Sequence, residues 1–321
     1  MDVLTRTAAG RGLSRVATRL LQSPMALRRW ATASLVANVV IVVTGALVRL
    51  TSSGLGCPTW PRCTEDSYVS HPALGYHGAI EFGNRLLTFV LILIAILTWA
   101  SAMAQPRDPM RPRVHTLALI MLLGVPAQAV IGGITVLTGL NPLVVAFHLL
   151  ISMILIALAV LMVRRTRGIV RQPGDARSVA LVRATFVAMG VAVWLGTVVT
   201  GSGPHAGDLE APRTGFDPAL VAHVHAAAVY VAVGLTIACV WVLRSRAAVA
   251  LLGIEIVQGA IGFVQYHTGL PVALVAAHLL GAAAAIALET NLLLSVRPTA
   301  AIEVAPELVN TQQRWRSAGV R

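Results

Sequence analysis

The sequence predicts an all-α integral membrane protein in which eight transmembrane helices form two pseudo-symmetric four-helix bundles. Three observations predict this fold: an apolar composition, eight apolar segments of membrane-spanning length, and an internal repeat. Of the 321 residues, 56% are hydrophobic and only 12% are charged. A soluble domain of this size cannot bury that much apolar surface, so the composition indicates a protein that crosses a membrane several times.

Each apolar segment is close to the roughly 20 residues that a helix needs to cross a bilayer. The segments cover residues 31–50, 77–103, 114–137, 142–163, 179–200, 218–243, 247–268 and 271–296. Arginines gather before the first segment, between the second and third, and after the fourth, sixth and eighth. By the positive-inside rule both termini are therefore cytoplasmic. The net charge of +12 is a topology signal, and nucleic acid is excluded as a partner.

An internal repeat divides the membrane part into two bundles. The segment QAVIGGITVLTGLNPLVVAFHLL (128–150) aligns without a gap to QGAIGFVQYHTGLPVALVAAHLL (258–280), at an offset of 130 residues. Two copies in the same orientation imply a pseudo-twofold axis along the membrane normal. The predicted parts are a basic cytoplasmic tail (1–30), an N-terminal bundle (31–163), a cytoplasmic linker (164–178), a C-terminal bundle (179–296) and a cytoplasmic tail (297–321).

Two cysteines lie in the loop SSGLGCPTWPRC, which follows the first segment. The arginine distribution places this loop outside, where thiols are oxidised, so we expect a disulfide between Cys57 and Cys63. A zinc site is a poor alternative, because no second Cys/His pair accompanies these cysteines.

Polar side chains recur at a similar depth in the four even-numbered segments, toward the outer face. They are Glu81, Asn84 and Arg85 in the second segment, His148 in the fourth, His223 and His225 in the sixth, and His278 in the eighth. The first three share one helix face. Facing side chains of a four-helix bundle are a common way to hold a metal or a cofactor.

Histidines from two helices, with no carboxylate or cysteine beside them, suit haem better than zinc. Haem iron takes one axial ligand on each face, whereas zinc takes three or four protein ligands. The negative haem propionates would also suit Arg85. The alternative is that each histidine only hydrogen-bonds within its bundle. The repeat relation between His148 and His278 favours the ligand interpretation.

Several motifs together resemble the haem A synthase family. They are GALVRLTSSGLGCPTWPRC (45–63), IEFGNRLLT (80–88), TGSGPHAGD (200–208) and the two HLL sites, and the resemblance extends over about residues 31–296. It implies an oxidoreductase that oxidises the C8 methyl group of haem O to the formyl group of haem A, for cytochrome oxidase assembly. It also implies two bundles of four helices, with haem b in the C-terminal bundle and haem O as substrate in the N-terminal bundle.

The resemblance also implies roles for individual residues. His225 and His278 would bind the iron of haem b, and His148 would bind the iron of the substrate haem. His225 is favoured over His223 because it precedes the small residues HAAA, as the family's histidine does. Glu81 would be the catalytic carboxylate, acting as a proton acceptor or as an electrostatic stabiliser of the oxidised carbon.

The sequence departs from the family at Asn84. The family pattern is Glu-x-x-His-Arg, and here it reads Glu81-Phe82-Gly83-Asn84-Arg85. The chain therefore resembles a form of the family with Asn in place of the second-segment His. An amide is a poor iron ligand, so we expect the iron opposite His148 to keep an open face.

Two rival functions remain open: a di-haem membrane cytochrome b that transfers electrons, and a non-catalytic haem carrier or chaperone. The first would favour two fixed ligands on each iron, against Asn84, and the second would make Glu81 dispensable. Expected partners are haem O, haem A, membrane lipid, a haem O synthase, cytochrome oxidase assembly factors and an electron donor that the sequence does not identify. The expected location is the plasma membrane, with the haem sites toward the outer face.

Three other polar residues are expected to have ordinary structural roles. Gln128 and Gln258 recur in the repeat and are expected to hydrogen-bond between helices or to a haem edge. Glu289 is expected to extend to the cytoplasmic surface or to pair with Arg297. Glu255 has no obvious partner, and the sequence assigns no role to it, to His223 or to His205.

Overall fold

The computed structural model describes residues 21–106 and 113–299. Within these residues, 8 helices are long and apolar enough to cross a membrane, as predicted. They are α2 (Pro24–Leu50), α3 (Gly75–Met103), α4 (Val114–Leu137), α5 (Pro142–Thr166), α6 (Ala176–Ser202), α7 (Pro218–Leu243), α8 (Arg246–His267) and α9 (Val272–Leu293). The 3₁₀ helix η2 (Pro72–Leu74) precedes α3. The predicted basic tail over 1–20 and the C-terminal tail over 300–321 lie outside the described residues.

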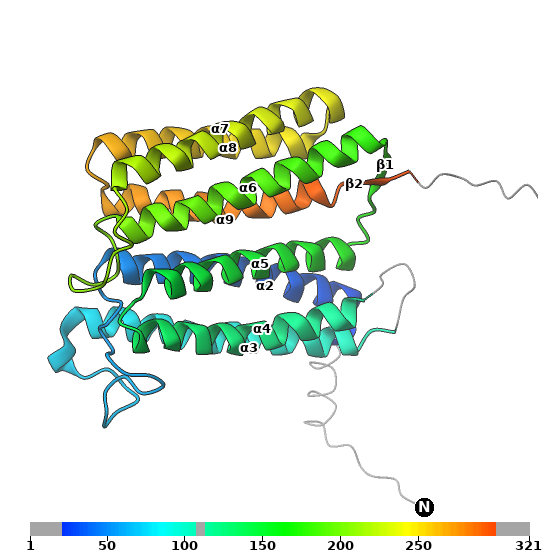
Figure 1. Cartoon of the computed structure of the whole chain (residues 1–321). Helices are drawn as coiled ribbons and strands as arrows, with labels where there is room; N and C mark the ends of the chain where they lie inside the picture. The colour runs from blue at the N-terminus through cyan, green and yellow to red at the C-terminus, as the bar shows by residue number, and fades with distance from the viewer. Residues whose placement is uncertain (1–20, 107–112, 300–321) are drawn as a thin grey trace, which may run out of the picture.

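The helices lie in layers, which Figure 1 shows edge-on. α3 and α4 form one outer layer and α7 and α8 the other, with α2 and α5 and then α6 and α9 between them. The two halves of the chain meet where α2 and α5 pack against α9, and α5 also packs against α6. The all-α membrane fold is therefore confirmed, and each half supplies four of the spanning helices.

Helix starts agree with local sequence signals. Asn141 caps α5 and Asp217 caps α7, and each is followed by a proline at the first helical position, where the missing N–H costs nothing. α2 begins at Pro24 after the capping residue Ser23, and so seven residues earlier than the predicted apolar segment. Arg28 and Arg29 lower the hydropathy of this first part, although it is helical.

The arginine-rich end holds one feature that was not predicted. Strand β1 (Gln172–Gly174), in the linker between the halves, pairs in parallel with β2 (Val296–Pro298) after α9. Close by, the buried Arg164 of α5 donates to Asn291 Oδ1 at 2.6 Å and to the Leu294 carbonyl at 2.8 Å. Both hydrogen bonds of Arg164 join the first half of the chain to the end of α9.

The outer loops join the halves at the opposite end. Arg49, near the end of α2, donates to the carbonyls of Thr200 and His205 at 3.0 and 2.6 Å. The Gly54 N–H donates to the Gly207 carbonyl at 2.9 Å. The two halves are therefore held together by polar contacts at both ends.

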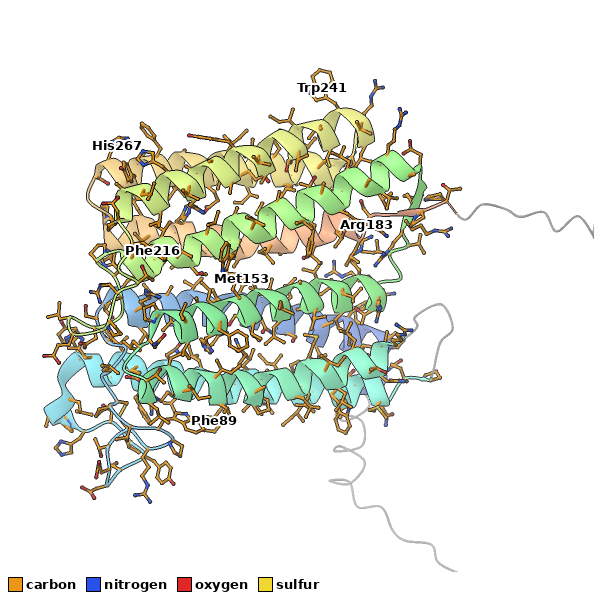
Figure 2. All side chains as sticks on the ribbon, viewed as in Figure 1. Phe89, Met153, Arg183, Phe216, Trp241 and His267 are labelled. Carbon is orange, nitrogen blue, oxygen red and sulfur yellow. A yellow bond between two sulfur atoms is a disulfide. The ribbon has the colours of Figure 1, made fainter. Side chains whose placement is uncertain are left out.

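Large apolar side chains cover the outside of the helices. Phe89 and Trp241, labelled in Figure 2, are 68% and 77% exposed and project away from the helices. A surface of this kind is unfavourable in water and favourable in lipid. The arrangement is that of a multi-pass membrane protein.

Candidate haem-binding sites

The predicted site residues lie at one level of the molecule. Glu81, His148, His225 and His278 each lie about two turns from the N-terminus of α3, α5, α7 and α9 respectively. These four helices begin at the end of the molecule that carries the long outer loops (Figure 1). The sequence repeat therefore translates into side chains at the same depth in both halves.

His225 and His278 face each other across the C-terminal half. Their ring centroids are 6.5 Å apart and the rings are nearly perpendicular, at 82°. The Nδ1 of His225 donates to the Ala192 carbonyl of α6 at 2.9 Å, because a carbonyl can only accept. This bond leaves Nε2 as the unprotonated nitrogen, which is the one a metal binds.

Glycines make room for these rings. A Cβ placed on Gly196 of α6 would lie 3.3 Å from Cε1 of His225, and one on Gly262 of α8 would lie 3.4 Å from Cε1 of His278. In the first half, a Cβ on Gly132 would lie 3.2 Å from Cε1 of His148. Gly132 and Gly262 are equivalent in the repeat, so the sequence did contain a signal for this packing.

The histidine pair fits a haem iron. Two metal–nitrogen bonds of about 2 Å each, with the imidazole rings beyond them, put the ring centroids about 6 Å apart. The backbone of Gln258 lies beside the His278 ring, but His278 Nδ1 is buried with no partner in good hydrogen-bond geometry. No group of 3 or more His, Cys, Asp or Glu able to hold a metal occurs in the part of the chain that the structure describes. Two opposed imidazoles suit haem and are too few for structural zinc.

Gly196→Val should displace His225 and reduce haem binding. The added methyl groups would occupy the position of the His225 ring, and α6 cannot retreat because it packs closely on α7. We expect the haem affinity of the C-terminal half to fall at least about tenfold. Gly190→Val on the same helix is the matched control, since a Cβ there meets no atom within 4 Å. Equal haem content in the two purified variants, measured by absorption spectroscopy, would contradict this packing role.

His148 lies in a related setting in the N-terminal half. Gln128 of α4 donates to the His148 carbonyl at 2.9 Å and to Ser152 Oγ at 2.6 Å, so this glutamine does hydrogen-bond between helices. The His148 Nδ1 is buried and makes no hydrogen bond to the described residues. Within those residues, the only two histidine rings in contact are His225 and His278, so His148 has no histidine opposite it there.

Asn84 is held by a neighbouring helix. Its Oδ1 accepts a hydrogen bond of 2.8 Å from Thr44 Oγ1 of α2. Gly45, next to Thr44, faces open space, since a Cβ there would meet nothing within 4 Å. A second, weaker repeat relates GALVRLTSSG (45–54) to GTVVTGSG (196–203), so Gly45 corresponds to Gly196, which lies beside the His225 ring. A Cβ at Gly45 would thus meet no side chain, whereas one at the corresponding Gly196 would meet an imidazole.

Glu81 and Arg85 form an ion pair that holds the outer loop. Glu81 is 5% exposed, and its Oε1 accepts from Arg85 Nη2 at 2.5 Å and from Nε at 3.1 Å. Its Oε2 accepts from the Cys57 N–H at 2.6 Å. Arg85 also donates to the carbonyls of Cys57, Thr59 and Arg62. The carboxylate is therefore paired and fully hydrogen-bonded, as a buried charge must be.

Cys57 and Cys63 form a disulfide, which confirms the predicted pairing. Between them, Trp60 packs on α4, where the position of a Gly133 Cβ is already taken by its indole ring. Gly133 is next to Gly132, which faces His148. The disulfide loop therefore covers the N-terminal half at the end where α3 and α5 begin. Trp60 was not singled out from the sequence, because a tryptophan in a loop gives no signal of what it covers.

Arg85 has no spare donor in this arrangement. The five N–H groups of a guanidinium are shared among six contacts to Glu81 and to the loop carbonyls. The pairing of Arg85 with a propionate stays a prediction, and it would require an N–H to leave a loop carbonyl.

The other histidines lie apart from the facing pair. His223 Nδ1 donates to the Ala219 carbonyl of its own helix at 2.7 Å, and its ring packs edge-on against Tyr266. His205 Nε2 donates to the Leu270 carbonyl at 2.9 Å, between the outer loop and the α8–α9 turn. Glu289 is fully buried, so the expectation that it extends to the surface was wrong: α9 is packed against α8 and against α2, α5 and α6.

Comparisons with known proteins identify relatives of this chain. Residues 28–206 match the model of a family described as cytochrome oxidase assembly protein. The chain is 31% identical to haem A synthase of Shewanella oneidensis over 149 residues, which is 42% of this chain and 44% of that protein. It is 35% identical to haem A synthase of Geobacillus thermodenitrificans over 105 residues, or 32% of this chain and 31% of that protein. It therefore matches less than half the length of these relatives.

Proposed function

The chain belongs to the family of cytochrome oxidase assembly proteins, and from this premise we propose that it is a haem A synthase, which oxidises a methyl group of haem O to the formyl group of haem A. The observation that carries the proposal is the asymmetry between the two histidine sites. The C-terminal half offers two facing imidazoles, His225 and His278, while the N-terminal half offers His148 and leaves open space by Gly45.

The C-terminal half would hold haem b between His225 and His278. A haem held by two histidines supplies one-electron transfer and has no free face for a substrate. The Ala192 carbonyl keeps the His225 ring in one orientation and tautomer, and it increases the basicity of Nε2. Gly196 and Gly262 allow the two rings to sit close to α6 and α8.

The N-terminal half would bind haem O as the substrate, with His148 on one face. Glu81 lies at the same depth and would accept a proton or stabilise positive charge at the carbon that is oxidised. The disulfide loop and Trp60 would exclude water from this site at the outer end, which protects a reactive centre from side reactions. Because Glu81 also binds the Cys57 N–H, the position of the loop and the position of the carboxylate are coupled.

Asn84→His should change the spin state of the haem bound beside His148. An imidazole at this position is one turn from Glu81 and could fill the open space by Gly45, as His225 fills the space by Gly196. We expect wild-type protein reduced and loaded with haem O to bind carbon monoxide in the N-terminal half, and the variant to be low-spin there and to bind little. Asn84→Ala is the control, because it removes the amide without adding a ligand. A wild-type N-terminal haem that is already low-spin and inert to carbon monoxide would refute the open face.

The proposed function is tested by the haems that the purified protein carries. Extraction followed by chromatography should yield haem B together with haem O or haem A, and protein supplied with haem O and an electron donor in the presence of O₂ as the oxidant should accumulate haem A. Haem B alone, in the amount expected for both halves, would indicate an electron-transfer cytochrome. Bound haem O that is never converted would indicate a carrier.

The proposed orientation places the haem sites toward the outer face of the plasma membrane. It is supported by the arginines of the described residues, which lie mainly at the end opposite the disulfide loop. A disulfide in that loop agrees with an oxidising compartment. A haem O synthase and the assembly factors of cytochrome oxidase are the proposed partners, since one makes the substrate and the others use the product.

A further inference from the structure

A buried polar layer crosses the C-terminal half on the arginine-rich side of the haem site. All four helices contribute to it: Thr185 from α6, Thr236 and Cys239 from α7, Glu255 from α8 and Glu289 from α9. Thr236 Oγ1 donates to Glu255 Oε1 at 2.9 Å, and Thr185 Oγ1 lies 3.3 Å from Cys239 Sγ. Each of these five residues is at most 5% exposed.

The repeat shows that packing does not require these acids. At the offset of 130 residues, Glu255 corresponds to Val125 and Glu289 to Ala159 in the N-terminal half. Both equivalents are buried apolar residues in the same places on α4 and α5. Two carboxyl groups have thus replaced apolar side chains only in the half that carries the facing histidines.

Most of the carboxyl oxygens in the layer have no partner. Both oxygens of Glu289 and the Oε2 of Glu255 are buried without a hydrogen bond to the described residues. An ionised carboxylate in such a place is unfavourable unless a cation compensates it, and two adjacent carboxylates also repel each other. The ion pair found among the described residues is Glu81–Arg85, far from this layer. Protonation is the simplest way for these groups to be buried.

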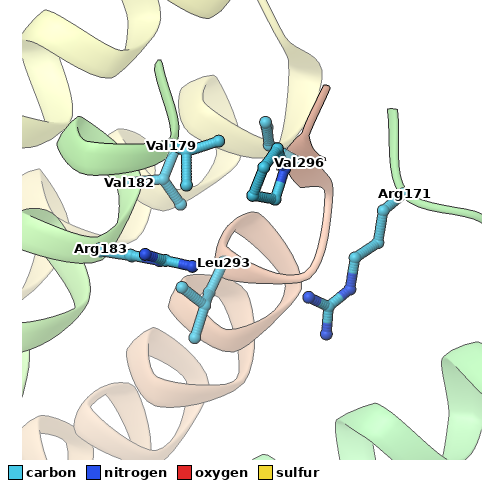
Figure 3. Close-up of a pocket in the computed structure, with 7 residues that line it drawn as sticks. Arg171, Val179, Val182, Arg183, Leu293 and Val296 are labelled. Carbon is cyan, nitrogen blue, oxygen red and sulfur yellow. The ribbon is translucent and has the colours of Figure 1, made fainter. Parts of the chain in front are cut away.

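A small pocket lies at the arginine-rich end, one helical turn from this layer. It lies between α6 and the end of α9 and is lined by Arg171, Val179, Val182, Arg183, Leu293, Val296 and Pro298 (Figure 3). Leu293 is one turn beyond Glu289 on α9, and Val182 is one turn before Thr185 on α6, so the pocket adjoins the layer.

Few charged groups face the layer. From α6, Arg183 lines the pocket, and from α5, Arg164 is bonded to Asn291 and Leu294. From α7, Cys239 interacts electrostatically with both acids. Among the described groups that face the layer, the two carboxyl groups can gain or lose a proton without breaking a hydrogen bond to another helix.

We propose that Glu255 and Glu289 form a proton-binding site that takes up a proton from the arginine-rich side when the haem between His225 and His278 is reduced. This inference rests on the proposed function only in assuming that haem. The balance is as follows: an external one-electron reductant gives one electron to the iron, and the fraction of the carboxylate pair that holds a proton rises, with that proton taken from water. Oxidation of the iron reverses both events.

The expected coupling follows from distance. Eleven residues of α9 separate His278 from Glu289, which is about 16 Å along a helix. Unit charges that far apart, at an effective dielectric constant of about 20, change the proton affinity about sixfold. For a one-electron couple a sixfold change corresponds to about 45 mV. The haem potential should therefore fall by about this amount as the pair loses its proton.

Two measurements on the purified haem-containing protein test the inference. Infrared spectroscopy in H₂O and D₂O detects the carbonyl band of buried protonated carboxylic acids, and each of Glu255→Gln and Glu289→Gln should remove part of it. Redox titrations with mediators across the neutral and alkaline range should show the fall in potential in wild type and its loss in both variants. Glu65→Gln, in the exposed outer loop, is the control that also removes one carboxyl.

The outcomes separate this inference from the proposed function. No protonated carboxyl band in wild type, or the same dependence of potential on pH in all variants, would overturn the proton site. Wild-type protein that never carries a haem in the C-terminal half would overturn the proposed function, and the coupling with it. The carbonyl band alone would then establish that the acids are protonated.

Discussion

We expect His225→Ala to remove the low-spin haem that we propose for the C-terminal half, and His223→Ala, two residues away on the same helix, to leave it in place. His225 faces His278 and is oriented by the Ala192 carbonyl, while His223 bonds to its own helix and packs on Tyr266. Haem iron that loses one of two axial ligands becomes high-spin or dissociates. We expect essentially complete loss of the low-spin b-type spectrum in His225→Ala and in His278→Ala.

The His223 variant makes this test specific. It removes an imidazole of the same size from the same turn of α7, so a general effect on folding or membrane insertion would appear in both variants. Absorption spectra of the reduced membranes and of the purified proteins provide the measurement. A b-type spectrum that persists in both His225→Ala and His278→Ala would refute the ligand assignment, and its loss in His223→Ala would point to a different pair.

We expect Glu81→Gln to suppress the proposed conversion of haem O to haem A while haem binding persists. The amide keeps the shape of the side chain but can neither carry a negative charge nor accept a proton. Removing a general base or an electrostatic stabiliser commonly lowers rates at least about 100-fold. We expect a decrease of that size in haem A formation, with accumulation of haem O or of a hydroxylated intermediate, measured by chromatography of extracted haems.

Glu81 also fixes the outer loop, so a second variant is needed to separate the two roles. Arg85→Gln leaves the carboxylate in place but removes the donors to Glu81 and to the carbonyls of Cys57, Thr59 and Arg62. Each lost charge-assisted bond typically destabilises a fold by about 1.5–3 kcal/mol. If activity falls equally in both variants, the carboxylate acts by holding the loop. A much larger loss in Glu81→Gln, with the loop still protected from proteases, supports a chemical role.

Hydropathy and the repeat predicted most of the fold. The apolar segments match the spanning helices closely, because a helix that crosses a bilayer needs about 20 mostly apolar residues in a row, and such a run is visible in the sequence. The exception is the start of α2, where arginines of the first turns mask seven helical residues. The short β1–β2 ladder was not predicted, since pairing between three-residue strands depends on which segments the folded helices bring together.

The sequence predicted how far along the helices the candidate site residues lie, but it did not predict which residues they contact. Helix periodicity places Glu81 and Arg85 on one face, and it cannot show that the loop returns to bind both of them. The burial of Glu289 was missed for a related reason: α2, α5 and α6, which pack against α9, come from distant parts of the sequence. The partner of Asn84 is Thr44, on another helix, and a single sequence does not record such pairs.

The contacts of Arg49 limit how this protein could be recombined with its relatives. Arg49 belongs to the first half of the chain, but both of its carbonyl partners belong to the second, and Gly54 bonds to Gly207 across the same seam. Because the partners of Arg49 are backbone carbonyls, a chimaera that took the second half from another species would keep this seam if Arg49 were retained and the new loop followed the same backbone course. Replacing Arg49 would instead remove both hydrogen bonds at once.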